Sequence, residues 1–192
     1  MKNYSTDKLR NISIIGHGGA GKTTLAESML FSSGAIQRIG RVEDGTSTTD
    51  FDADEIKRQI TINAAMAPVE WKDCKLNLID TPGYFDFVGE VIASLRVVES
   101  ALVNLCAVSG VEVGTEKVWK LADGANLARI CFVNKMDREN ANFNKVITQA
   151  REMFGANVVP VQIPIGSEDS FKGIVDLLQM KAIIYSGEKF QI

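Results

Sequence analysis

The first residues that could do chemistry form a glycine-rich segment, GHGGAGKT at residues 16–23, which fits the pattern Gly-x-x-x-x-Gly-Lys-Ser/Thr. Loops of this kind turn backbone N–H groups toward one point, where they bind the phosphates of a nucleotide. The Lys22 ammonium is predicted to reach the β- and γ-phosphates, and the Thr23 hydroxyl to bind Mg²⁺. The predicted nucleotide-binding residues of this loop are Gly18, Gly19, Ala20, Gly21, Lys22, Thr23 and Thr24.

A second segment, Asn134-Lys135-Met136-Asp137, follows the apolar run at residues 130–133 and fits Asn-Lys-x-Asp. The Asp137 carboxylate can accept hydrogen bonds from N1–H and from the 2-amino group of guanine, whereas adenine offers neither donor there. Sites built on such pairs can discriminate by roughly 10⁴–10⁵. We therefore predict a guanine site, in which Asn134 and Lys135 brace the phosphate-binding loop and cover the base.

A third segment, Asp80-Thr81-Pro82-Gly83, ends the apolar run at residues 76–79. We predict that Asp80 holds Mg²⁺ through a water molecule. The N–H of Gly83 is predicted to meet the γ-phosphate, so its position would differ between the GTP and GDP states. A simple Asp-x-Pro-Gly turn is the alternative, which the order and spacing of the three motifs disfavour.

The elements that must position these motifs alternate between strand-like and helical patterns. This alternation predicts an α/β fold with a doubly wound, mostly parallel sheet and helices on both faces. The second and third strands are expected to be antiparallel, because only a short turn joins them. Strands are expected near residues 11–16, 61–70, 74–80, 101–108, 129–134 and 158–163, and helices near residues 22–33, 86–98, 114–124 and 139–154.

Residues 35–60 are polar and have little periodicity, which is typical of a functional or disordered loop. Their acidic residues, Asp50, Asp52, Asp54 and Glu55, could be interpreted as a metal site. The glycine and the terminal bidentate glutamate of an ion-binding loop are missing, which favours a solvated loop.

The composition is that of a soluble globular domain, with 192 residues, 45% of them apolar and 23% charged. A net charge of −3 argues against general nucleic-acid binding. His17 is predicted to be structural, and the three cysteines to be buried and reduced. The N-terminal segment lacks the apolar stretch of a signal peptide, and no run is long enough to span a membrane. We therefore expect a cytoplasmic protein with no membrane partner.

Beyond these motifs, the chain resembles the GTPase domain of bacterial translation elongation factor G over nearly its whole length. The resemblance implies a P-loop GTPase fold, Mg²⁺, and hydrolysis of GTP to GDP that the ribosome stimulates and that is slow in this chain alone. It also implies that Thr61 binds Mg²⁺ in the GTP state and that Lys22, Gly83 and Tyr84 are catalytic. The matching stretches are GHGGAGKTTL at 16–25, DTPGYFDFVGEV at 80–91, SLRVVESAL at 94–102, AVSGVEVGTEKVW at 107–119, FVNKMDRENANF at 132–143 and VPVQIPIGSEDSFKGIVDLLQMKA at 159–182.

The chain departs from that family in three places. The phosphate-binding loop has Gly18-Gly19 where the family usually has Ile-Asp, and Arg58-Gln59 replaces Arg-Gly before Ile-Thr-Ile. Tyr84 replaces the histidine that orients the attacking water. The pattern of glycines with tyrosine is similar to a divergent, second-copy subgroup of elongation factor G.

The resemblance also implies a division of the chain. Residues 1–165 are expected to form an incomplete GTP-binding domain without the fifth guanine motif and the last strand and helix. Residues 166–192 are expected to begin an insert subdomain. The residue pattern after residue 171 itself predicts a short amphipathic helix followed by a strand. The chain would then be a truncated part of a longer protein whose other domains act on the ribosome.

Other functions remain open at this point. A tetracycline-resistance ribosomal-protection GTPase and a release-factor-recycling GTPase share this domain plan. A guanine-nucleotide switch that does not hydrolyse GTP is kept open by Tyr84. A P-loop ATPase or small-molecule kinase is disfavoured by the segment from Asn134 to Asp137.

Overall fold

The computed structural model describes residues 2–155, 157–186 and 189–191. The chain divides into two compact units, the first made of Met1–Asn104 and Val113–Phe132, the second of Leu105–Glu112 and Val133–Ile192. The predicted domain boundary after residue 165 stays a prediction.

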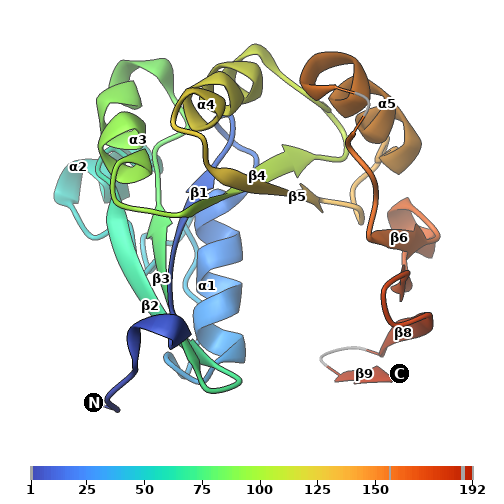
Figure 1. Cartoon of the computed structure of the whole chain (residues 1–192), viewed down its shortest axis with the longest axis horizontal. Helices are drawn as coiled ribbons and strands as arrows, with labels where there is room; N and C mark the ends of the chain where they lie inside the picture. The colour runs from blue at the N-terminus through green and yellow to red at the C-terminus, as the bar shows by residue number, and fades with distance from the viewer. Residues whose placement is uncertain (1, 156, 187–188, 192) are drawn as a thin grey trace. The chain divides into compact units, whose positions relative to one another are not determined.

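A five-stranded sheet carries the motifs, in the order β2-β3-β1-β4-β5 (Figure 1). The central strand β1 is parallel to both of its neighbours, β3 and β4, whereas β2 is antiparallel to β3. The predicted α/β fold with a mostly parallel sheet is therefore confirmed. The strands are β1 (Leu9–Ile15), β2 (Ala65–Trp71), β3 (Cys74–Asp80), β4 (Ser100–Cys106) and β5 (Ala128–Asn134).

Helices cover both faces of β1. Because successive side chains of a strand point to opposite faces, neighbouring residues of β1 contact different helices. Ile14 packs in a buried cluster with Ala26 and Leu30 of helix α1 (Lys22–Ser32). The neighbouring Ser13 shares a hydrogen bond of 3.0 Å with Ser94 of α3 (Val88–Leu95). Helix α4 (Val113–Gly124) lies beside α3 (Figure 1). Short 3-10 helices at Thr6–Lys8 and Phe85–Phe87 precede β1 and α3.

Residues 35–60 are not the solvated loop that the sequence predicted. They contain a helix, α2 (Ala53–Arg58), which begins with a capping box between Asp52 and Glu55. Asp50 and Glu55 are buried, whereas Asp52 and Asp54 are exposed. The pattern Asp-x-x-Glu before a helix is a recognisable start signal, and the low periodicity of the surrounding segment hid it.

In the second unit, helix α5 (Phe143–Phe154) begins at Asn142, whose side chain accepts a hydrogen bond from the N–H of Lys145. A separate antiparallel sheet follows, in the order β6-β7-β8-β9, after which the chain ends. Its strands are β6 (Gln162–Ile165), β7 (Gly173–Asp176), β8 (Lys181–Ser186) and β9 (Lys189–Gln191), and a 3-10 helix at Glu168–Ser170 joins the first two.

Two predictions about this unit are wrong. The strand expected at 158–163 begins only at Gln162 and pairs with β7, where Pro164 fits because β6 is an edge strand. The helix expected after residue 171 is the hairpin of β7 and β8. The Asp176 carboxylate accepts hydrogen bonds of 2.9 Å from the N–H groups of Leu178 and Gln179, which forms a turn in place of a helix.

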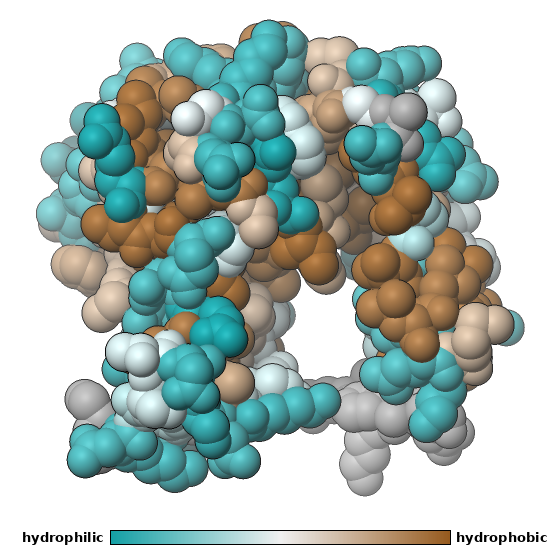
Figure 2. Space-filling model, in the orientation of Figure 1, coloured by the Kyte–Doolittle hydropathy of each residue, from teal (hydrophilic) through white to brown (hydrophobic). Residues whose placement is uncertain are grey.

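The second sheet exposes apolar side chains, which Figure 2 shows around the strands near β6. Leu178 and Met180, in the turn between β7 and β8, are 78% and 80% exposed. Among the described residues, no helix is long and apolar enough to cross a membrane. The three cysteines are free, as predicted, but only Cys106 is buried, while Cys74 and Cys131 are partly exposed.

Candidate functional site

The phosphate-binding loop joins the end of β1 to the start of α1 in a conformation that needs glycine. Gly21 precedes the helix with a left-handed backbone, φ 88°. A Cβ atom on Gly16 would lie 2.5 Å from the carbonyl oxygen of Asn104 on β4. The Asn104 side chain in turn donates a hydrogen bond of 3.1 Å to the carbonyl of Ala20. The loop is thus held closely against the sheet.

His17 has the structural position that its place in the loop suggested. It is buried, and its Nδ1 shares a hydrogen bond of 2.7 Å with the hydroxyl of Thr115 on α4. A Cβ atom on Gly114 would lie 3.1 Å from the Cβ of His17. The imidazole therefore links the loop to α4.

Lys22 is buried although it carries an ammonium group. Its Nζ donates hydrogen bonds to the carbonyls of Gly16, at 3.1 Å, and His17, at 3.0 Å. Burial lowers the pKa of Lys22 to about 8, against the attraction of the Asp80 and Asp50 carboxylates, which favours the charged form. The ammonium is therefore poised to interact with further negative groups, such as phosphate oxygens.

Oxygen atoms from three segments gather at the end of β3. The Thr49 hydroxyl donates a hydrogen bond of 2.9 Å to Oδ2 of Asp80. The hydroxyls of Thr23 and Thr61 share a hydrogen bond of 3.0 Å. Asp50 is 3% exposed and belongs to the same cluster, because the charges of Asp50 and Asp80 affect each other. The three residues predicted to bind Mg²⁺, namely Thr23, Thr61 and Asp80, thus lie with Thr49 and Asp50.

Burial disfavours the charged form of both carboxyl groups, Asp50 and Asp80. Burial raises the pKa of Asp50 to about 6, and the nearby Asp80 charge adds to this while Thr61 opposes it. Burial also raises the pKa of Asp80, against the stabilising effect of Thr23, Lys22 and Thr49. The Thr61 hydroxyl faces Asp50 without reaching hydrogen-bonding geometry. A cation at this place would relieve both groups.

The donor set fits Mg²⁺. Both carboxylate oxygens of Asp50 and Oδ1 of Asp80 are buried and accept no hydrogen bond from any described residue. Buried carboxylate oxygens without partners are costly, and Mg²⁺ prefers oxygen ligands from one or two carboxylates together with phosphates. No group of three or more His, Cys, Asp or Glu side chains that could hold a metal occurs among the described residues.

Two further buried carboxylates hold residues 35–60 in place. Glu27 of α1 accepts hydrogen bonds from the N–H groups of Gly40, at 2.8 Å, and Thr48. Glu55 accepts hydrogen bonds of 2.9 Å from the N–H groups of Ile62 and Asn63. These contacts bracket Thr49, Asp50 and Thr61, and so place their oxygens beside Asp80.

Gly83 and Tyr84 lie on the phosphate-binding loop. A Cβ atom on Gly83 would be 2.4 Å from Nζ of Lys22 and 2.7 Å from the backbone N and Cα of Gly18, so the loop backbone leaves no room for a side chain there. The Tyr84 ring lies against Gly18, and Tyr84 is 48% exposed. The three residues predicted to be catalytic, Lys22, Gly83 and Tyr84, are therefore neighbours.

The Asn-Lys-x-Asp segment lies in the second unit, at the end of β5. The Asn134 side chain accepts a hydrogen bond of 2.8 Å from the N–H of Lys135, whose backbone is left-handed at φ 63°. Met136 is buried with Ala107 and Ala141, and Asp137 is exposed. The turn thus buries its apolar member and presents the Asp137 carboxylate.

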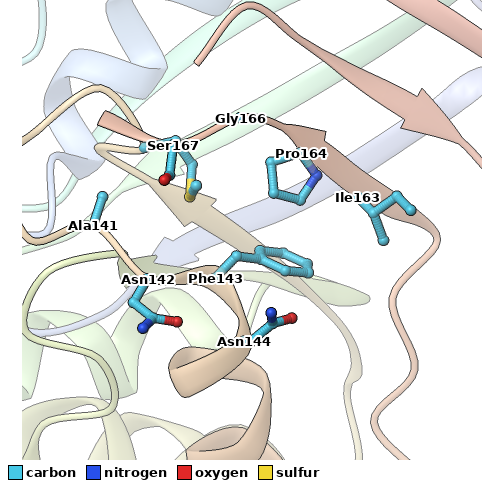
Figure 3. Close-up of a pocket in the computed structure, with 9 residues that line it drawn as sticks. Ala141, Asn142, Phe143, Asn144, Ile163, Pro164, Gly166 and Ser167 are labelled. Carbon is cyan, nitrogen blue, oxygen red and sulfur yellow. The ribbon is translucent and has the colours of Figure 1, made fainter. Parts of the chain in front are cut away.

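A pocket of about 410 Å³ lies beside this turn, between the start of α5 and β6. Figure 3 shows the Phe143 and Pro164 side chains pointing toward one another in it. Met136 is the member of the guanine motif that lines it, so the pocket is not formed by the side chains predicted to bind the base.

Sequence reasoning missed Thr49 and Glu27 as members of the site. It considered Asp50 and Glu55 only within an acidic cluster, which it interpreted as part of a solvated loop. The Asp-x-x-Glu cap was the available signal for Glu55. No sequence signal near Glu27 indicated its role, because the N–H groups that donate hydrogen bonds to its carboxylate lie much later in the chain.

Comparison with known proteins gives the family. A family model described as the elongation factor Tu GTP binding domain matches residues 7–189. The chain is 50% identical over 189 residues to elongation factor G 1 of Treponema denticola. This match covers 96% of this chain and 28% of that protein. A crystal structure of a Thermus thermophilus protein matches with a TM-score of 0.90 and 35% identity, over 95% of this chain and 27% of that one.

This chain therefore spans less than a third of the length of either relative. The matched residues include the phosphate-binding loop, the Asp80 cluster and the Asn-Lys-x-Asp turn. With its mostly parallel sheet and P-loop, the chain belongs to the family of elongation factor Tu GTP-binding domains and is similar to elongation factor G.

Proposed function

We propose that this protein binds GTP and GDP together with Mg²⁺ and hydrolyses GTP to GDP and phosphate. The observation that carries the proposal is the cluster around the phosphate-binding loop. There a buried ammonium, Lys22, stands near carboxylate oxygens of Asp50 and Asp80 that have no hydrogen-bond partner among the described residues. The family match supports the same function.

In this proposal Thr23, Thr61 and Asp80 hold Mg²⁺, and Asp50 is an additional oxygen donor. When bound, the ion would neutralise charge on the phosphate oxygens. The cluster brings its donors from α1, from residues 49–61 and from β3. Binding therefore depends on the hydrogen bonds that Glu27 and Glu55 make to residues 40–63.

The residues of the chain act mainly by position and charge. The amides of Gly18, Gly19, Ala20, Gly21, Lys22, Thr23 and Thr24 bind the phosphates, and the Lys22 ammonium stabilises the charge that develops on the γ-phosphate. Water attacks the γ-phosphorus, the bond from that phosphorus to the bridging oxygen of the β-phosphate breaks, and GDP and inorganic phosphate are the products. Gly83 contributes its N–H, and Tyr84 contributes a neutral hydroxyl that can hydrogen-bond the water.

The base is read by the second motif. Asp137 accepts hydrogen bonds from guanine, and Asn134 and Lys135 support the turn. The exposed position of Asp137 and the hydrogen bond between Asn134 and the Lys135 N–H support these roles.

The longer protein is proposed to act in translation, because the curated relative is named an elongation factor. Ribosome-stimulated hydrolysis coupled to translocation is the proposed role, and the cytoplasm the proposed location. The net charge of −3 supports a chain that does not itself bind nucleic acid by sequence.

A competition titration tests the proposal. A fluorescent GDP analogue is bound with Mg²⁺ and displaced by GDP, GTP, ADP or ATP. GDP and GTP are expected to displace it at far lower concentration than ADP and ATP. Displacement by ATP as effective as by GTP would show that the assignment of the base is wrong.

Substitution of Asp137 sharpens this test. Asp137→Asn replaces an acceptor by a donor, and should weaken GDP binding by about ten- to a hundredfold while improving binding of xanthosine diphosphate. Glu139→Gln, which removes an exposed charge two residues away, is the matched control and should change neither.

Tyr84 favours a second candidate function, a guanine-nucleotide switch that binds GTP without hydrolysing it. A single-turnover assay separates the two candidates, since the switch would retain bound GTP whether or not ribosomes are added to the longer protein. A ribosomal-protection GTPase would hydrolyse GTP as well, and would differ in releasing tetracycline from ribosomes.

A further inference from the structure

The Tyr84 ring occupies the space beside Gly18 in which a side chain would otherwise lie. A Cβ atom built on Gly18 would be 3.2 Å from Cζ and 3.3 Å from Cε1 and Cε2 of Tyr84, and these are its nearest neighbours. Gly18 is not among the residues with a left-handed backbone, in contrast to Gly19 at φ 77°. The obstacle to a side chain at position 18 is therefore the tyrosine ring and not the backbone conformation.

The residue before the tyrosine makes the contact closer still. A Cβ atom on Gly83 would lie 2.4 Å from Nζ of Lys22 and 2.7 Å from both N and Cα of Gly18. Residues 83–84 thus lie directly on the loop and on its ammonium group. Lys22 itself donates hydrogen bonds to the carbonyls of Gly16 and His17, within the loop.

The contact with Tyr84 is of a kind that can open. The side chain is half exposed, and among the described residues no hydrogen bond of its hydroxyl is found. The ring is therefore held on Gly18 by van der Waals contact alone, which is individually weak. Gly18 has no side chain of its own that would keep the ring away.

Lys22 and the loop amides are the groups that bind the β- and γ-phosphates in a P-loop. Gly83 lies against the same ammonium and against Gly18, so residues 83–84 must move outward before a γ-phosphate can enter and accept a hydrogen bond from the Gly83 N–H. GDP has no γ-phosphate and needs no such movement. We infer that Tyr84, seated on Gly18, holds residues 83–84 over the phosphate-binding loop and lowers the affinity for GTP relative to GDP, an inference that rests on the proposed function.

The effect follows from the fraction of molecules in which the loop is covered. If about 90% are covered, the apparent dissociation constant for GTP is raised about tenfold over that of the open form. The position of residues 83–84 over the loop depends on both Tyr84 and Gly18, because the ring can lie there only if position 18 carries no side chain. Tyr84 acts here as a positioning residue through Gly83.

The test measures dissociation constants for GDP and for a slowly hydrolysed GTP analogue in one calorimetric series with Mg²⁺. Tyr84→Ala removes the ring, and the GTP-to-GDP affinity ratio should rise about five- to tenfold. Tyr84→Phe keeps the ring without the hydroxyl and should keep the ratio within about twofold of the original. Unfolding midpoints of all variants provide the check that the fold is retained.

A second substitution tests the partner of the ring. Gly18→Ala places a methyl group against the ring and should raise the ratio in the original chain. In the Tyr84→Ala background the same substitution should change the ratio much less, because the ring through which it acts is gone. This non-additivity distinguishes the contact from an independent effect of alanine on the loop.

Each outcome decides the matter. An unchanged ratio in Tyr84→Ala, with GDP still bound, refutes the cover and leaves the proposed function standing. Equal effects of Tyr84→Phe and Tyr84→Ala would assign the effect to the hydroxyl and refute the role of the ring. A chain that binds neither nucleotide would refute both proposals.

Discussion

The hydroxyl of Thr49 donates a hydrogen bond of 2.9 Å to Oδ2 of Asp80, and this bond ties the polar segment of residues 35–60 to the end of β3. The neighbouring Asp50 is thereby buried next to a second carboxylate. Two carboxylates and three threonine hydroxyls then share one small region. Burial raises the pKa of both carboxyl groups, so a bound cation should stabilise the cluster, and this effect can be measured.

Asp50→Asn should therefore have opposite effects with and without metal. Without Mg²⁺, loss of a buried charge should stabilise the chain by about 1–2 kcal/mol, since the Asp50 carboxylate has no partner. With Mg²⁺ and GDP, the variant should gain less stability than the original chain, because a donor is lost. Urea unfolding with EDTA and with Mg²⁺–GDP measures both effects. Destabilisation of equal size in both conditions would show that Asp50 has only a structural role.

Glu27→Ala is expected to release residues 35–60. The substitution removes two hydrogen bonds from backbone N–H groups to a buried carboxylate, which should cost about 2–4 kcal/mol. Limited proteolysis should then cut this segment faster, and Mg²⁺-dependent GDP binding should weaken. Glu43→Ala, at an exposed glutamate of the same segment, is the matched control and should resemble the original chain. Equal proteolysis rates in both variants would contradict the role of Glu27.

The elements that carry the motifs could be predicted because their signals are local. The apolar runs before Gly16, Asp80 and Asn134 are strands in one mostly parallel sheet. The helix after Lys22 follows from its apolar spacing. The carboxyl ends of parallel strands lie at one edge of the sheet, where ligands bind. Motifs that directly follow such strands therefore indicate the site from the sequence alone.

The rest depended on contacts between distant residues. The buried carboxylate of Glu27 accepts hydrogen bonds from the N–H groups of Gly40 and Thr48, and no sequence pattern around Glu27 indicates these partners. The helix expected after residue 171 failed because the Asp176 side chain competes for backbone N–H groups. The contact between Gly18 and Tyr84 joins two departures from the family that the sequence analysis combined in one pattern, although no pattern in the sequence shows that they touch.

Cys131 predicts a dependence of stability on pH. Burial raises the pKa of its thiol from the ordinary 9.0 to about 11, against the opposing effect of Arg129. Between these values the unfolded chain loses the thiol proton while the folded chain keeps it, so folding becomes less favourable as the pH rises. The contribution of Cys131 to stability should fall by about 1 kcal/mol from pH 8 to pH 10.

Urea unfolding of the original chain and of Cys131→Ala, under reducing conditions, measures this contribution as the difference between the two. At pH 8 the thiol is protonated in both states, so that value provides the baseline. A difference that stayed constant to pH 10 would show that the thiol is not buried enough to resist ionisation.

The last prediction concerns the rate of hydrolysis and the residue that follows Gly83. An imidazole can donate or accept through either nitrogen and can become cationic near neutral pH, whereas a tyrosine hydroxyl is neutral at pH 7. Tyr84 can therefore orient water but cannot add positive charge near the γ-phosphate. Tyr84→His should raise the single-turnover rate of GTP hydrolysis by about ten- to a hundredfold, within the usual contribution of a positioned acid–base group.

The comparison needs a variant that changes the ring and adds no chemistry. Tyr84→Phe keeps the contact with Gly18 but cannot hydrogen-bond a water, so its hydrolysis rate should fall below that of the original chain. Rates measured at saturating GTP are independent of any change in affinity. If Tyr84→His left the rate unchanged or lowered it, with and without ribosomes added to the longer protein, another group would orient the water, and Tyr84 would affect nucleotide binding alone.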